Sequence, residues 1–308
     1  MPIQTLTTPT PKTDTNLDQE LQKRMRGPQR HRLLQGYPVP SLMKNYPEGS
    51  DYVPLTPGQQ RPLIVGVLPH ASCNPSVRGC GYCTFPHEPF VRSQVSQTVQ
   101  AVMAEIENSP IQGRAVEALY FGGGTANLTP PDDFRALADK LTRHFRFPKG
   151  EVTLEGAPAF FTSQKGALLD ILESHFPQSS IRLSMGVQSF DPQRIAEMGR
   201  ESIGNPTQVT RAVRAAQSRN MTTSADMLIN LPGQTLAEMK QDLQRASDLG
   251  FSQVCLYHLV LFRGLGTPWA ADRNQLARLP DNQLAFSNWL EVRQMALDLG
   301  YQQKTLTN

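Results

Sequence analysis

Six short apolar runs alternate along this chain with segments of helical periodicity, and this alternation constrains the fold more than any other feature. The expected strands are 62–68, 116–121, 151–155, 181–187, 221–229 and 252–259. The expected helices are 94–108, 131–146, 163–174, 191–198, 206–218, 235–249 and 281–299. Strands that alternate with helices pair in parallel through right-handed crossovers. The pattern therefore predicts an α/β fold, either an open doubly wound sheet or a partial barrel.

The first 60 residues do not share this pattern. Residues 1–16 are rich in Thr and Pro and are predicted to be disordered, and an irregular extension with a short helix at 17–25 follows. We therefore divide the chain into an N-terminal extension (1–60), a core (61–270) and the start of a C-terminal region (271–308).

Charge and composition exclude several functional classes. The first 50 residues carry seven Lys or Arg against four Asp or Glu, and the remainder carries 23 of each. No aromatic residues interleave the basic stretch at 23–32, so we expect a solvated arm and no nucleic-acid partner. The sequence shows neither a signal peptide nor an apolar run long enough for a membrane span, which predicts a cytoplasmic protein without a membrane partner.

Three of the four cysteines fall within eleven positions, directly after the first expected strand. They are Cys73, Cys80 and Cys83, in the spacing Cys-x6-Cys-x2-Cys. Clustered thiols in a protein of cytosolic type indicate a metal or catalytic site. Three thiolates can hold three irons of a [4Fe-4S] cluster and leave the fourth iron open. The alternative is a structural zinc site with His70 or His87 as the fourth ligand.

Other unusual residues also follow strands, where parallel α/β folds place their sites. They are Gly122, Gly123, Gly124 and Thr125 after the second strand, Glu155 at the end of the third, Gln188 and Arg200 after the fourth, and Asp226 at the end of the fifth. Glycines allow a backbone to approach a ligand closely, and a carboxylate can accept hydrogen bonds from both hydroxyls of a ribose. Taken singly, each residue has a structural alternative, such as a tight turn, a helix cap or a salt bridge.

Five motifs in order add a resemblance to a known family. They are Leu119-Tyr-Phe-Gly-Gly-Gly-Thr125, Val152-Thr-Leu-Glu-Gly-Ala-Pro158, Arg182-Leu-Ser-Met-Gly-Val-Gln-Ser-Phe-Asp191 with Gly199-Arg200, Asp226-Met-Leu-Ile-Asn-Leu-Pro-Gly-Gln-Thr235, and Leu256-Tyr-His-Leu with Gly266-Thr-Pro268. With these motifs the chain resembles the radical SAM enzymes, and within them the coproporphyrinogen III dehydrogenase-like (HemN/HemW-like) group. The resemblance runs from about Leu63 to Ala270 and implies a partial (β/α)6 barrel.

The resemblance also implies roles for individual residues. Cys73, Cys80 and Cys83 would ligate the cluster, and Tyr82 would contact the adenine of S-adenosylmethionine (SAM). The remaining implied SAM contacts are the loop Gly122 to Thr125, with its glycine backbone at the methionyl amine, Glu155 at the ribose, Gln188 and Arg200 at the methionine, and Asp226 at the nucleoside.

The implied reaction is reductive cleavage of SAM at a [4Fe-4S] cluster. The 5′-deoxyadenosyl radical would then abstract hydrogen from a small-molecule substrate, with a tetrapyrrole as the candidate. An electron donor such as a flavodoxin or ferredoxin would supply the electron. Two alternatives within the resemblance are a haem-trafficking, HemW-like binding protein and a HemN-like radical SAM C-methyltransferase.

The chain departs from the family pattern in three places. The family spacing is Cys-x3-Cys-x2-Cys, so the x6 loop is expected to bulge, with Pro75 and Gly79 folding it back. Coproporphyrinogen dehydrogenases carry another cysteine where this chain has Phe85. The resemblance implies a C-terminal domain, and we expect residues 271–308 to be the truncated start of that region. The fourth cysteine, Cys255, is predicted to be a buried core thiol.

Overall fold

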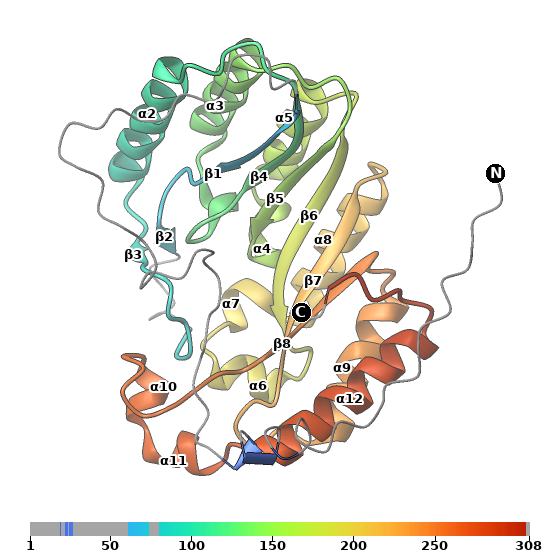
Figure 1. Ribbon diagram of the computed structural model, residues 1–308. Coiled ribbons are helices and arrows are strands. Elements are labelled where there is room, and N and C mark those ends of the chain that lie inside the picture. The colour runs from blue at the N-terminus through green and yellow to red at the C-terminus, as the bar shows by residue number, and fades with distance from the viewer. Residues whose placement is uncertain (1–18, 20–21, 24, 27–60, 74–79, 306–308) are drawn as a thin grey trace.

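The computed structural model describes residues 19, 22–23, 25–26, 61–73 and 80–305. Its centre is one wholly parallel sheet of six strands, each paired with the next along the chain (Figure 1). The strands are β1 (Leu63–Val67), β4 (Val116–Phe121), β5 (Glu151–Gly156), β6 (Ser180–Gln188), β7 (Thr222–Ile229) and β8 (Gln253–His258). The parallel α/β architecture predicted from the alternation is confirmed.

Helices connect successive strands and cover one face of this sheet (Figure 1). The longer ones are α2 (Arg92–Asn108), α3 (Pro131–His144), α5 (Ala167–His175), α8 (Pro206–Gln217), α9 (Leu236–Asp248) and α12 (Asn282–Asp298). Shorter turns lie between them: η2 (Ala126–Leu128), α4 (Pro158–Phe161), η3 (Ser163–Gly166), α6 (Pro192–Glu197) and α7 (Glu201–Gly204). The main hydrophobic core fills the space between this helical layer and the sheet.

The two faces of the sheet differ in polarity because side chains alternate along each strand. In β4, Leu119 and Phe121 are buried in the core, whereas Tyr120 between them is 38% exposed. The same alternation places Leu183 and Met185 of β6 in the core. Ser184 of β6 lies on the opposite, inner face, opposite Glu155 of β5 in the ladder. The inner face of the curved sheet therefore carries the polar side chains.

One expected helix begins later than predicted. The helix expected at 163–174 begins only at Ala167, because Gln164, Lys165 and Gly166 have positive φ angles and form the separate turn η3. Strand β7 ends at Ile229, as expected for the strand at 221–229, and Asp226 lies three residues before that end. Of the short helix expected at 17–25, residues 19, 22, 23 and 25 are described, and they are helical. The predictions for the rest of 1–60 and for Pro75 and Gly79 lie outside the described residues.

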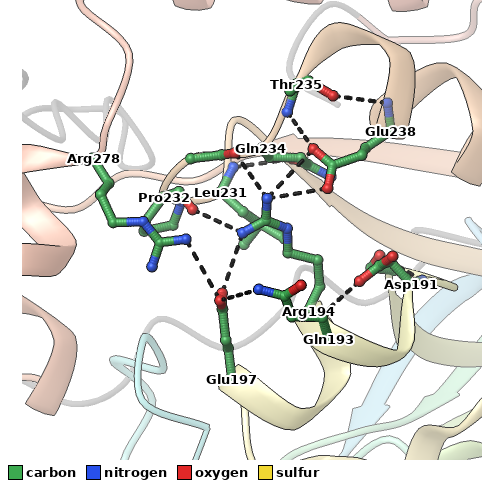
Figure 2. Close-up of polar contacts among 12 residues, drawn as sticks. Asp191, Gln193, Arg194, Glu197, Leu231, Pro232, Gln234, Thr235, Glu238 and Arg278 are labelled. Carbon is green, nitrogen blue, oxygen red and sulfur yellow. Dashed lines mark hydrogen bonds and ion pairs between the residues drawn. The ribbon is translucent and has the colours of Figure 1, made fainter.

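After β8 the chain turns back through α10 (Pro268–Ala271) and α11 (Arg273–Ala277) before entering α12. A second, smaller core forms here from Ile195, Met198, Leu228, Leu231, Leu259, Leu261, Trp269 and Ala270. Figure 2 shows the polar network beside this core, in which Arg194 of α6 pairs with Glu197 at 3.2 Å and with Glu238 of α9 at 3.1 Å. Arg278, just after α11, reaches Glu197 at 3.5 Å. This network ties the returning segment to α6 and α9.

Within the described residues, no helix combines the length and the apolar character that crossing a membrane requires.

Candidate functional site

The cysteine loop is clipped at its base by a short ladder. Strand β2 (Ser72–Cys73) pairs in parallel with β3 (Glu88–Pro89), and the Phe90 backbone N–H donates to the Cys73 carbonyl at 2.9 Å. Further along, the Cys83 N–H donates to the Cys80 carbonyl at 2.8 Å, which turns the chain between these two cysteines. All three thiols are half-buried. The two ends of the cysteine loop, at Ser72–Cys73 and at Glu88–Phe90, are therefore held side by side.

The three thiols lie close enough together for their charges to affect one another's pKa. Burial raises the pKa of Cys73, the Thr125 hydroxyl lowers it, and the charge of Cys80 raises it again. Burial also raises the pKa of Cys83, and the charges of Cys80 and Cys73 add to that effect. Mutual repulsion of this kind acts between thiolates that are close together, and a bound metal would remove it because the metal takes each ligand in its deprotonated form.

A tryptophan from the returning segment packs on this loop. The Trp269 ring meets the Tyr82 ring edge to face, with 5.6 Å between centroids. The backbone N–H of Trp269 donates to the Gly81 carbonyl at 2.9 Å. A Cβ atom at Gly81 would lie only 2.2 Å from the indole, so this position requires glycine. Tyr82, predicted to contact adenine, is thus held in place from the far end of the chain.

The glycine loop after β4 runs directly against the start of the cysteine loop. The Gly122 N–H donates to the Val67 carbonyl at 3.1 Å, and the Thr125 N–H donates to the Ser72 carbonyl at 3.0 Å. Gly123 and Gly124 have φ angles of +86° and +52°. A Cβ at Gly124 would lie 2.6 Å from the Ala71 carbonyl carbon. The glycines are therefore required by close backbone packing between the two loops, as well as by positive φ.

Two carboxylates lie on the inner face of the sheet. The Tyr120 hydroxyl donates to Glu155 Oε2 at 2.9 Å, and the Ser184 hydroxyl donates to Asp226 Oδ2 at 3.1 Å. Burial raises the pKa of Glu155, and the Tyr120 hydrogen bond opposes it. Burial, followed by repulsion from Glu155, raises the pKa of Asp226 to about 6. The negative charges of the two carboxylates therefore repel each other across the sheet. Each carboxylate also has a second oxygen that can accept a hydrogen bond from a ligand with hydroxyl groups.

Gln188 and Arg200 lie beside one another at the end of β6. Gln188 has a positive φ of 68°, and the β6–β7 register shifts between Gly186 and Gln188. A non-glycine residue in this conformation is strained, and such strain clusters at functional sites. Arg200 is buried; its Nη1 donates to Cys80 Sγ at 3.0 Å and its Nη2 donates to the Gly186 carbonyl at 2.5 Å. This arginine connects the β6 edge with the cysteine loop.

The predicted site residues thus gather at one edge of the sheet. Thr125 touches Cys73, a Cβ at Gly122 would meet Glu155, and Arg200 reaches Cys80. Their roles toward SAM and the cluster stay predictions.

Comparison with known proteins identifies the family. The profile of the Radical SAM superfamily matches residues 73–246, which begin at the first of the three clustered cysteines. The chain belongs to the radical SAM superfamily.

Its relatives place it near the HemN- and HemW-like members. It is 26% identical over 238 residues to the heme chaperone HemW of Haemophilus influenzae, covering 74% of this chain and 58% of that protein. It is 28% identical to the mitochondrial radical S-adenosyl methionine domain-containing protein 1 of Bos taurus, covering 82% and 55%. The radical SAM enzyme coproporphyrinogen III oxidase (HemN) of Escherichia coli superposes with a TM-score of 0.66 at 25% identity, covering 79% of this chain and 54% of that one. The fold is accordingly a partial (β/α)6 barrel, and the chain spans a little over half the length of these relatives.

Radical SAM proteins use a [4Fe-4S] cluster and SAM, and the residues here fit both. Three thiols project from one clipped loop, and the buried Nε of Arg200 has no hydrogen-bond partner among the described residues. The zinc alternative would take His70 or His87 as its fourth ligand, and in both histidines Nδ1 is already in a hydrogen bond. His70 accepts a hydrogen bond from the Ser72 N–H, and His87 contacts the Phe85 carbonyl.

Sequence reasoning missed Tyr120, Ser184 and Trp269. A signal existed for Tyr120, since it is a polar residue between the core residues Leu119 and Phe121. Trp269 directly follows the Gly266-Thr-Pro268 motif, but its packing on Gly81 joins positions too far apart for any local pattern. The buried state of Cys255 is confirmed, although this cysteine faces Asp226 on the inner side of the sheet rather than the apolar core.

The packing of Trp269 on the cysteine loop predicts a specific coupling. Gly81→Ala forces a methyl group into the indole and should cost about 1–3 kcal/mol of unfolding free energy, the usual cost of overpacking. In a Trp269→Ala background the same substitution should cost much less, because the clash is gone. Urea unfolding of the four proteins of this cycle measures the difference. Gly66→Ala is the matched control, since a Cβ there meets nothing within 4 Å. Equal costs of Gly81→Ala in both backgrounds would contradict the contact.

The raised pKa of Asp226 predicts a pH-dependent effect of its removal. Its pKa is about 6 in the fold against an ordinary value of 3.8, so its contribution to stability is complete below about pH 4 and is lost as pH rises through 6. Asp226→Asn should therefore stabilise the cluster-free, reduced protein at pH 7.5 by on the order of 2 kcal/mol more than at pH 4. Urea unfolding at the two pH values tests this. A gain that does not depend on pH would refute the assignment.

Proposed function

We propose that this chain cleaves SAM reductively at a [4Fe-4S] cluster and uses the resulting radical on a tetrapyrrole. The observation that carries the proposal is the gathering of the cysteine loop, the glycine loop, Glu155 and Arg200 at one edge of the barrel. Together, the bound cluster and SAM supply a one-electron cleavage that releases a 5′-deoxyadenosyl radical. The electron comes from an external one-electron donor of the flavodoxin or ferredoxin type.

The protein's own residues bind and orient SAM in this proposal. The Tyr120 hydroxyl donates to Glu155 Oε2, so Glu155 Oε1 would accept the hydrogen bonds of the ribose hydroxyls. Gly122 to Gly124 bring backbone rather than side chains to the methionyl end of the ligand. Tyr82, against which Trp269 packs, would contact the adenine and exclude water from that side of the ligand. Water exclusion protects a radical from side reactions and strengthens the electrostatic contacts around it.

The tetrapyrrole assignment rests on the functions of the relatives. One is a coproporphyrinogen III oxidase and another is a heme chaperone, and tetrapyrroles are common to both. Phe85, where coproporphyrinogen dehydrogenases carry a further cysteine, is 77% exposed beside the cysteine loop. This substitution favours a reaction other than coproporphyrinogen decarboxylation.

The similarity to HemW supports a second candidate function, haem binding without turnover. Two assays on the reconstituted protein separate the candidates. Formation of 5′-deoxyadenosine that increases when a tetrapyrrole is added supports the enzyme. A stoichiometric shift of the haem Soret band, without such stimulation, supports the binding protein.

Replacement of one cluster ligand should abolish the chemistry. We expect Cys80→Ala, after anaerobic reconstitution, to lose the [4Fe-4S] cluster and all release of 5′-deoxyadenosine under dithionite, because only two ligating thiolates remain. Iron and acid-labile sulfide analysis, with chromatography of the nucleoside, measures both. Cys255→Ala is the matched control, since it removes the one cysteine outside the loop, and it should retain the cluster. A full cluster in Cys80→Ala would overturn the ligand assignment.

A further inference from the structure

Arg200 is a buried cation that lacks a carboxylate partner within the described residues. Its side chain is 7% exposed. Arg194, six residues earlier and 6% exposed, provides the contrast, because Glu197 and Glu238 both neutralise it (Figure 2). An isolated buried charge is costly, so buried charges in proteins are paired or lie beside a metal site. Something other than a carboxylate must therefore compensate Arg200.

The hydrogen bonds of the guanidinium identify that group. Nη1 donates to Cys80 Sγ at 3.0 Å, and Nη2 donates to the neutral carbonyl of Gly186. Nε is buried and has no partner in the described part of the chain. The acceptor that can carry a negative charge is thus the sulfur of Cys80, one of the three clustered thiols.

The backbone around Arg200 is built to bring its side chain to this position. Gly199 has a φ of +68° and turns the chain immediately before it. A Cβ at Gly186 would lie 3.2 Å from Nη2, and one at Gly204 would lie 3.6 Å from it. The Arg200 N–H donates to the Ile195 carbonyl at 2.9 Å, and the Gly204 N–H donates to the Arg200 carbonyl at 2.9 Å. Glycines on both sides leave space for the guanidinium, and both backbone groups of the residue are fixed.

We propose that Arg200 raises the reduction potential of the [4Fe-4S] cluster by donating a hydrogen bond to the thiolate of Cys80. The inference rests on the proposed function in that it requires the cluster to be bound. One-electron reduction adds one negative charge to the cluster and no proton. A cation that hydrogen-bonds a ligating sulfur stabilises the more negative, reduced form to a greater extent than the oxidised form. Hydrogen bonds to sulfur and nearby charge are among the factors that set the potentials of such clusters.

The test is a redox titration of the reconstituted protein, without SAM or substrate, monitored by the EPR signal of the reduced cluster. Arg200→Gln should raise the ratio of oxidised to reduced cluster roughly tenfold at a fixed ambient potential, a shift of about 59 mV toward more negative values. Arg200→Lys retains the charge but loses the planar fork that reaches both Cys80 and Gly186, and it should shift the potential in the same direction by a smaller amount.

Arg182→Gln is the matched control. It removes the same charge from β6, but Arg182 pairs with the carboxylate of Glu151 at 2.9 Å rather than with a cysteine. Its potential should equal that of the wild type. An equal shift in this control, or an unshifted potential in Arg200→Gln with its cluster intact, would overturn the proposal.

The remaining outcomes are also decisive. Arg200→Gln could show a folded circular dichroism spectrum and yet retain no cluster, and in that case Arg200→Lys is the deciding variant. A lowered reduction potential of the cluster in Arg200→Lys supports the proposal. A wild-type reduction potential overturns it. Loss of the cluster from both variants would assign Arg200 to cluster assembly and would overturn the tuning role. A wild-type protein that assembles no cluster refutes the proposed function itself, which distinguishes that failure from a failure of this inference.

Discussion

Burial of one face of the parallel sheet is the constraint on which the rest of this structure depends. Leu119, Leu154 and Leu183 are fully buried beneath the helical layer, and the strict alternation of strand residues then turns their neighbours to the inner face. Because all six strands are parallel, their carboxyl ends meet at one edge. The packing of the sheet against the helices therefore determines both the polar character of the inner face and the position of the loops at this edge.

The cysteine loop is held from three directions by parts of the chain that are distant in sequence. The β2–β3 ladder closes its base, the glycine loop after β4 packs on its start, and Trp269 packs on Gly81. Arg200 then adds a charged contact to Cys80. A loop with a longer spacing than the family pattern is therefore supported by its surroundings. These contacts fix the described parts of the loop, Ser72–Cys73 and the segment that starts at Cys80, from outside the loop itself.

The fold was predictable because hydrophobic alternation is a local signal that repeats six times. The cysteine and glycine motifs could be located in the sequence because three clustered cysteines and three consecutive glycines each follow an expected strand, whereas their roles toward SAM and the cluster stay predictions. The predictions failed where a local signal was overridden, as at Gln164 and Lys165, whose positive φ angles delay the start of α5. Trp269 and the Arg200–Cys80 contact could not be predicted, because each joins segments that only the tertiary fold brings together.

The central claim is that three thiolates hold a [4Fe-4S] cluster with one iron left open for SAM. Mössbauer spectroscopy of the protein reconstituted with ⁵⁷Fe, with and without SAM, tests it most directly. The account predicts a spectrum in which one iron in four changes its signal when SAM is added, as the open coordination position requires. Two results would contradict the claim. One is stoichiometric zinc without acid-labile sulfide, and the other is a Mössbauer spectrum in which none of the four iron signals changes when SAM is added.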